Sequence, residues 1–163
     1  GDVYKRQAMN DDEKWMSLAL KQAIKAEEKG EVPVGAILVK DGFLIAKAHN
    51  QPISTNDATA HAEIQLLRAA GWHQRNYRLI DTTIYVTIEP CAMCLGAMMH
   101  ARITRMVFGA SDPKTGVCGS RADLTTESFF NHEMEISGGV LEKDCMELLQ
   151  SFFKSRRKNN LKA

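Results

Sequence analysis

The sequence predicts a single three-layer α/β domain, in which a mixed sheet of four or five strands has helices on both faces. Short β-branched runs alternate with stretches of helical periodicity along the chain. A strand–helix–strand unit within residues 83–109 implies a parallel crossover, whereas an earlier hairpin implies antiparallel strands. The chain has 163 residues, 44% of them hydrophobic, which suffices for one core and is crowded for two.

The first helix is expected from Asp11 or Asp12 to Lys29. Apolar residues recur there at helical spacing, acidic residues stand at its start, and Gly30 ends the pattern. Residues 1–8 lack this periodicity, and we interpret them as a non-native or disordered N-terminal extension that precedes a natural start at or near Met9. Residues 9–158 then form the single domain, and residues 159–163 form a C-terminal tail.

Two antiparallel strands and a second helix are expected next. The apolar run Val34–Val39 and the stretch Phe43–Ala48 are typical of strands, and Asp41-Gly42 between them is a hairpin turn signal. Residues 50–57 (NQPISTND) are rich in turn formers, and they lead into a helix from about His61 to Ala70. The loop thereby delivers His61 to the start of a helix.

The C-terminal half supplies the crossover. Thr83–Ile88 reads as a strand, Cys91–Ala101 as a buried helix, and Arg105–Gly109 as a further strand. After a polar loop over residues 111–121, a weak strand over residues 134–137 precedes a helix from about Glu142 to Arg157.

The segments HAE (61–63) and PCAMC (90–94) contain residues suited to a catalytic zinc ion. Zinc binds neutral imidazole and thiolate, and catalytic sites use three protein ligands so that water takes the fourth position. His61, Cys91 and Cys94 make up such a set. Because Cys91 and Cys94 are spaced i, i+3 in the first turn of a helix, they face the same side, and the helix N-terminus favours their thiolate form.

Glu63 is the predicted general acid/base. Residues i and i+2 point about 200° apart within a regular helix, so His61 and Glu63 can serve one site only if the helix begins at or between them. Zinc lowers the pKa of its bound water from about 15.7 to about 7, and a neighbouring carboxylate can then move protons. The set therefore predicts hydrolytic deamination with one Zn²⁺ per chain and a metal-bound water or hydroxide.

Other interpretations of the cysteine pair remain open. The pair could belong to a structural zinc knot in a non-catalytic binding module, although that interpretation leaves Glu63 unexplained. The fourth ligand of such a knot would come from Cys118, Cys145, His49, His73, His100 or His132. A thioredoxin-like redox pair is a further alternative.

The pairing of His-x-Glu with Pro-Cys-x-x-Cys is the signature of zinc-dependent nucleobase deaminases. Beyond it, the chain resembles the bacterial tRNA-specific adenosine deaminases from about Trp15 to Arg157. Ser111 and Cys118 depart from the family pattern, where an arginine and a small apolar residue are common. The resemblance rests on the segments EVPVGAILV (31–39), HNQPI (49–53), DATAHAEI (57–64), NYRLID (76–81), EPCAMCLGAM (89–98), VFGASDPKTG (107–116) and SFFKSRR (151–157).

The resemblance implies a cytidine-deaminase-like fold and the conversion of adenosine to inosine at the wobble position of an arginine tRNA anticodon. It also implies that Asn50 contacts the flipped-out base, while Val34 and Ile88 line its pocket. An asparagine amide both donates and accepts hydrogen bonds, which suits a purine edge, although Asn50 could instead stabilise its own turn.

The expected partner is the tRNA anticodon stem-loop. By the same resemblance, Asp112 and Lys114 approach the RNA in the loop after the last strand of the crossover. Arg156 and Arg157 could neutralise phosphates. The alternative for these four residues is a solvated loop and a solvated basic helix end. The family is homodimeric, and the methionine-rich helix 91–101 could pack at that interface or fill the core.

Charge and hydropathy set further expectations. Lys and Arg number 21 against 20 Asp and Glu, a formal net charge of +1, so RNA contact requires a local basic patch. This near-neutral charge favours the alternative of a free nucleobase or nucleoside deaminase. No apolar run approaches the roughly 20 residues that span a bilayer, and no signal-peptide pattern opens the chain. The sequence therefore predicts no membrane partner and a cytoplasmic location.

Overall fold

A five-stranded mixed sheet forms the middle of the molecule. The computed structural model describes the backbone of residues 2–162 and the side chains of residues 11–160. The strand order is β2-β1-β3-β4-β5, in which β1 is antiparallel to β2 and β3, while β3, β4 and β5 are parallel. The strands span Gly35–Lys40 (β1), Phe43–His49 (β2), Thr82–Ile88 (β3), Arg105–Ala110 (β4) and Glu135–Ser137 (β5).

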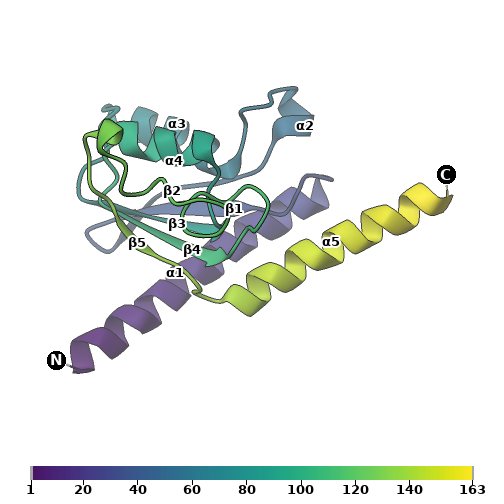
Figure 1. The fold of residues 1–163 in the computed structure, drawn as a ribbon, viewed down its shortest axis with the longest axis horizontal. Helices are drawn as coiled ribbons and strands as arrows, with labels where there is room; N and C mark the ends of the chain where they lie inside the picture. The colour runs from purple at the N-terminus through teal and green to yellow at the C-terminus, as the bar shows by residue number, and fades with distance from the viewer. Residues whose placement is uncertain (1, 163) are drawn as a thin grey trace.

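Helices cover both faces of this sheet, as predicted. Figure 1 shows the long helices α1 and α5 on one face and the helices α3 and α4 on the other. The β3–α4–β4 unit is the parallel crossover expected from the sequence. The helices span Asp2–Glu28 (α1), Pro52–Thr55 (α2), Ala62–Gln74 (α3), Ala92–His100 (α4) and Glu142–Lys162 (α5), and a 3-10 turn covers Ser128–Phe130 (η1).

Two hydrophobic clusters, one on each face of the sheet, pack the helices against it. Along β1, Ala36 and Leu38 face the core under α3 and α4, while Ile37 and Val39 face the core under α1 and α5. Gly35 begins the strand where α1 crosses closest, since a Cβ there would lie 2.1 Å from a backbone oxygen of α1. This alternation, with both faces buried, follows from the period of two in a strand.

The ends of the two longest helices differ from the prediction. Helix α1 begins at Asp2 rather than at Asp11 or Asp12, because residues 2–10 contain no proline or glycine that would end a helix. Helix α5 continues past Arg157 to Lys162 for the same reason. The interpretation of residues 1–8 as an extension and of residues 159–163 as a tail stays a prediction.

Two further boundaries near the site also differ. The segment 50–57 contains the short helix α2, which Pro52 starts because its fixed φ suits a first helical position. Helix α3 passes through Gly71 to Gln74, since one glycine costs a helix only about 1 kcal/mol. Within the described residues, no helix is long and apolar enough to cross a membrane.

Candidate active site

His61 occupies the position just before helix α3. Its backbone is extended (φ −65°, ψ 155°), and Glu63 lies in the first turn of the helix. Because His61 lies outside the helix, its side chain need not point about 200° away from that of Glu63, as it would within a continuous helix. This confirms the predicted condition that the helix begins at His61.

Cys91 stands in the same position before helix α4. Its backbone is extended (φ −80°, ψ 175°), and Cys94 lies in the first turn that follows. Glu89 and Pro90 connect the end of β3 to this helix. The N-termini of α3 and α4 thus bring His61, Cys91 and Cys94 into one cluster, in which all ligand atoms lie within 4.8 Å of one another.

The spacing of these atoms fits zinc. His61 Nδ1 lies 3.7 Å from Cys91 Sγ and 3.5 Å from Cys94 Sγ. A tetrahedral ion with a Zn–N distance of about 2.05 Å and a Zn–S distance of about 2.3 Å would separate N and S by about 3.6 Å. Among the described residues, no fourth His, Cys, Asp or Glu completes the cluster, as a structural knot would require.

The cysteines are electrostatically unequal before a metal is considered. A hydrogen bond from Cys94 lowers the pKa of Cys91 to about 4, with a further contribution from the His61 imidazole. The same hydrogen bond raises the pKa of Cys94, and the Cys91 thiolate raises the pKa of His61. The site thus stabilises one thiolate by itself, and a bound cation favours the second.

Glu63 is buried against this cluster, with 3% of its surface exposed. Burial raises the pKa of its carboxyl group above the ordinary value, because the charged form loses hydration. A carboxyl group with a raised pKa can hold a proton and release it, which is the requirement for acid/base catalysis near neutral pH.

Asn50 lies beside the same helix start. Its side-chain oxygen accepts a hydrogen bond of 2.8 Å from the backbone N–H of Ala62, and its own backbone N–H donates to Val34 O at 3.0 Å. The side-chain NH₂ group is a hydrogen-bond donor. Val34 is buried and Ile88 is half-buried at the end of β3. Asn50 therefore orders the loop that precedes α3.

Comparison with known proteins agrees with this geometry. A family model described as the cytidine and deoxycytidylate deaminase zinc-binding region matches residues 9–110, which include the whole cluster. The chain belongs to this deaminase family. The three-layer fold with a mixed sheet is accordingly the cytidine-deaminase-like fold that the sequence predicts, and the family's zinc chemistry matches the His/Cys/Cys donor set.

Within this family, the chain is similar to deaminases that are named for a tRNA substrate. The tRNA-specific adenosine deaminase of Haemophilus influenzae is 50% identical over 147 residues, which cover 90% of this chain and 85% of the relative. That of Bacillus subtilis is 47% identical over 150 residues, covering 92% and 93%. A solved structure from a study of A-to-I editing by tRNA deaminases at the wobble position has a TM-score of 0.81 and 41% identity, covering 83% of this chain and 98% of that one.

In this deaminase, a buried glutamate that sequence reasoning missed holds the loop after β4. The Glu89 carboxylate, 2% exposed, accepts backbone N–H groups from Asp112 (3.1 Å), Cys118 (2.9 Å) and Ser120 (3.1 Å), and also the Ser120 hydroxyl. Gly116 passes so close that a Cβ there would lie 2.5 Å from this carboxylate. An acidic residue between Ile88 and Pro90 was the available signal.

A second buried glutamate, Glu31, holds the other loop of the site, which contains Asn50. The Glu31 carboxylate accepts the backbone N–H groups of Ile53 at 3.0 Å and Ser54 at 2.7 Å. Burial opposes its ionisation, but these hydrogen bonds dominate and lower the pKa of Glu31. The loops that border the deaminase site are therefore both anchored by carboxylates beneath them.

The predicted RNA-contact residues are dispersed. The Asp112 carboxylate accepts the backbone N–H of Lys114 at 3.0 Å, so it shapes its own turn, and the Lys114 side chain is exposed. Arg156 donates a hydrogen bond of 2.9 Å to Gly30 O at the end of α1 rather than joining the cluster around His61. Arg157 is exposed on α5.

Proposed function

We propose that the protein hydrolytically deaminates adenosine to inosine at the wobble position of a tRNA anticodon, with one zinc ion per chain. The principal support is the three-ligand cluster with Glu63 buried beside it, in a chain that is highly similar to tRNA-specific adenosine deaminases. The identity extends over nearly the whole chain and so includes both anchored loops as well as the zinc motif.

In this proposal His61, Cys91 and Cys94 hold the metal, which when bound supplies Lewis acidity that lowers the pKa of a water molecule. Glu63 takes a proton from the attacking water, and it delivers protons to the purine ring nitrogen and to the departing amine. Water thus adds to the carbon that bears the exocyclic amine, the C–N bond breaks, and ammonia leaves.

The remaining site residues bind the substrate. The Asn50 NH₂ group donates to an acceptor nitrogen of the flipped-out base, since its oxygen is already engaged by Ala62. Val34 and Ile88 provide apolar contact with the purine ring. Asp112 orders the loop that presents Lys114 to the RNA. Arg156 and Arg157 contact phosphates farther along the stem-loop.

The decisive experiment incubates the zinc-loaded protein with the anticodon stem-loop and reads inosine at the wobble position. Free adenosine, cytosine and guanine are tested in parallel. Turnover of a free base without turnover of RNA would establish the alternative, a small-molecule deaminase. Zinc binding without any turnover would indicate a zinc-stabilised binding module.

Glu63→Ala provides the matched test of mechanism. The variant should retain zinc and fold while turnover falls by at least about 10²-fold, the usual scale for a lost acid/base group. Zinc content per chain and the melting temperature serve as controls for the variant's integrity. Activity equal to that of the original protein would refute the role of Glu63.

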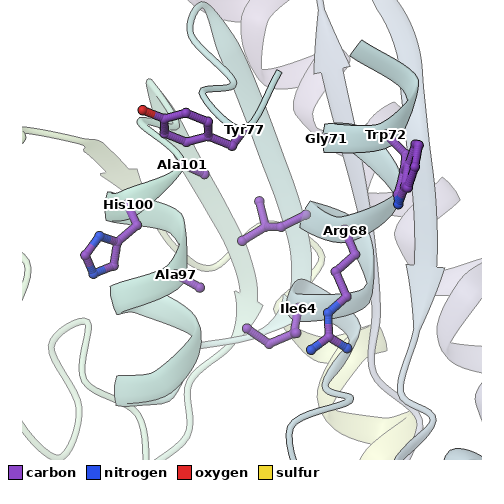
Figure 2. Close-up of a pocket in the computed structure, with 9 residues that line it drawn as sticks. Ile64, Arg68, Gly71, Trp72, Tyr77, Ala97, His100 and Ala101 are labelled. Atoms are coloured by element: carbon purple, nitrogen blue, oxygen red, sulfur yellow. The ribbon is translucent and has the colours of Figure 1, made fainter. Parts of the chain in front are cut away.

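We also propose that the protein is a homodimer that packs through the outer surfaces of α3 and α4. A groove of about 620 Å³ separates these helices there. Figure 2 shows Ile64 and Trp72 of α3 on one side and His100 of α4 on the other. Trp72 is 85% exposed and Tyr77 is 74% exposed, and apolar aromatic surface of this kind is typical of an interface.

The oligomeric state tests this interface. Trp72→Glu should shift the protein from dimer to monomer in sedimentation velocity, because a carboxylate would be buried without a partner. Phe43→Glu is the matched control, since Phe43 is 73% exposed at the β1–β2 hairpin and does not line this groove. A Trp72→Glu protein that stays dimeric would place the interface elsewhere.

A cytoplasmic location completes the proposal. Transfer RNA is found in that compartment, and its reducing conditions keep zinc-binding thiols available. The four cysteines of the chain are free thiols.

A further inference from the structure

We infer that a lysine-lined groove at the edge of the sheet binds the phosphate backbone of the RNA beside the target nucleotide, an inference that rests on the function proposed above. The groove has a volume of about 400 Å³ and runs across strand β2 between α1 and α3. We call it the lysine groove. The residues on which the argument depends are Lys25, Lys29, Lys47, His49, Gln51 and Gln65.

The lysine groove is a local excess of positive charge in a nearly neutral protein. Its lining residues include lysines from α1 and β2 and no aspartate or glutamate. Among the described side chains, none of these lysines has a carboxylate oxygen within 4.0 Å. With a formal net charge of only +1, the chain needs such a patch to attract RNA.

One of the lysines is oriented by the site itself. His49 is buried, and its Nδ1 lies 3.0 Å from Asn50 O while its Nε2 lies 3.3 Å from Lys29 Nζ. A carbonyl oxygen can only accept and an ammonium group can only donate, so Nδ1 carries the proton and Nε2 accepts from Lys29. Lys29 is thereby connected through the His49 ring to the backbone of the residue that we assign to base recognition.

The groove and the base pocket share a wall. His49, Asn50 and Gln51 are consecutive, so the lysine groove borders the residue assigned to the flipped base. Gln65 belongs to α3, the helix that follows His61 and contains Glu63, and its side-chain amide donates to Gln51 Oε1 at 3.1 Å. These amides can also exchange hydrogen bonds with ribose hydroxyl groups, which distinguish RNA from DNA.

The distribution of charge favours a polymer over a small anion. Lys25 lies in the last turn of α1 and Lys29 in the turn that follows this helix, while Lys47 projects from the neighbouring strand. Sites for a single free phosphate typically converge backbone N–H groups or a bidentate arginine on one point. Separate lysines with amides between them instead match successive phosphates of a nucleic acid strand.

The test compares two triple variants that change net charge equally. The groove variant is Lys25→Gln, Lys29→Gln and Lys47→Gln. The control is Lys14→Gln, Lys40→Gln and Lys143→Gln, which removes lysines outside the groove. Both are made in the Glu63→Ala background so that the stem-loop stays unconverted, and melting temperatures confirm their folding. Fluorescence anisotropy then gives stem-loop affinity between about 0.1 and 1 M salt, a range in which counterion release is measurable.

The groove variant should lose salt dependence together with affinity. Each phosphate contact to a single strand contributes about 0.7 to the slope of log K against log salt, or about fivefold in affinity between 1 M and 0.1 M. Loss of three contacts should flatten the slope by about 2 and weaken binding by about 100-fold at 0.1 M, with affinities converging at 1 M. The control variant should keep the original slope.

Several outcomes would overturn the inference. Equal affinity and slope in the groove variant would exclude the groove from RNA binding, and equal losses in both variants would indicate a net-charge effect. Inorganic phosphate that stabilises the original protein but not the groove variant, with RNA binding unchanged, would make this a small-anion site. Because wobble inosine formation is scored separately with the original protein, failure of the groove and failure of the proposed function are distinguishable.

Discussion

Replacing Glu89 by glutamine should loosen the loop over residues 111–121 and weaken substrate binding. The carboxylate accepts three backbone N–H groups at 2.9–3.1 Å and one hydroxyl group, shared between its two oxygens. A glutamine can turn its NH₂ group toward the Asp112 N–H and the Ser120 hydroxyl, which loses the first hydrogen bond, reverses the second and leaves the other two without charge assistance. Because a hydrogen bond to a charged group contributes about 1.5–3 kcal/mol and a buried unpaired N–H costs about 1–3 kcal/mol, we expect a loss of about 2–4 kcal/mol of unfolding free energy.

Urea denaturation and steady-state kinetics measure the two effects. Because the loop presents Lys114, we expect KM for the stem-loop to rise at least about tenfold while the zinc content stays at one ion per chain. Glu147→Gln is the matched control, since among the described side chains Glu147 makes only a surface contact of 4.0 Å with Lys143 and should change stability by less than about 0.5 kcal/mol. A Glu89→Gln loss below about 1 kcal/mol with an unchanged KM would refute the anchoring argument.

Two further changes test stability and metal binding. Burial opposes ionisation of Asp12, but hydrogen bonds from Arg105 (2.8 Å) and Tyr85 (2.7 Å) prevail and lower its pKa. Its stabilising contribution is therefore complete above the unfolded-state pKa and is lost as pH falls through the lowered folded pKa. Asp12→Asn should cost about 2–3 kcal/mol at pH 7 and little in strong acid, measured by urea denaturation across pH. Cys94→Ser should weaken zinc binding by more than about tenfold, read as zinc content per chain during dialysis against a chelator.

The parts of the site that the sequence predicted correctly are those with local signals. His61 and Glu63 could share a site only if a helix began between them, and the turn formers in residues 50–57 indicated that start. The spacing of Cys91 and Cys94 in a first helical turn is likewise a property of four consecutive residues. The strands of the mixed sheet followed from short β-branched runs for the same reason.

The anchoring glutamates depend on contacts that no local pattern encodes. Glu89 binds groups 23 to 31 positions away, and Glu31 binds groups 22 and 23 positions away. Only the tertiary fold brings these amides over the carboxylates. The predicted helix boundary was wrong where a weak local preference was overridden, as at Gly71, which lies within α3.

The lysine groove could not be predicted from the sequence, because it too depends on the tertiary fold. Lys25 lies on α1, Lys29 follows this helix directly and Lys47 lies on β2, so the patch exists only after the helix packs against the sheet edge. Net charge conceals it as well, because 20 acidic residues elsewhere balance 21 basic ones. A net charge near zero is therefore weak evidence against RNA binding, because it does not show how the charges are distributed over the surface.

The placement of Glu63 sets two electrostatic effects against each other. It lies in the first turn of α3, where the helix dipole favours the charged carboxylate. Its burial disfavours the same form, and because lost hydration costs a buried ion more than a helix terminus returns, the pKa of Glu63 rises. His61 and Cys91 stand just before the two helices in the same cluster, where the hydrogen bond from Cys94 lowers the pKa of Cys91 to about 4 and makes it a thiolate. The fold thus separates a group that exchanges protons from groups that bind a cation, although both stand at helix N-termini.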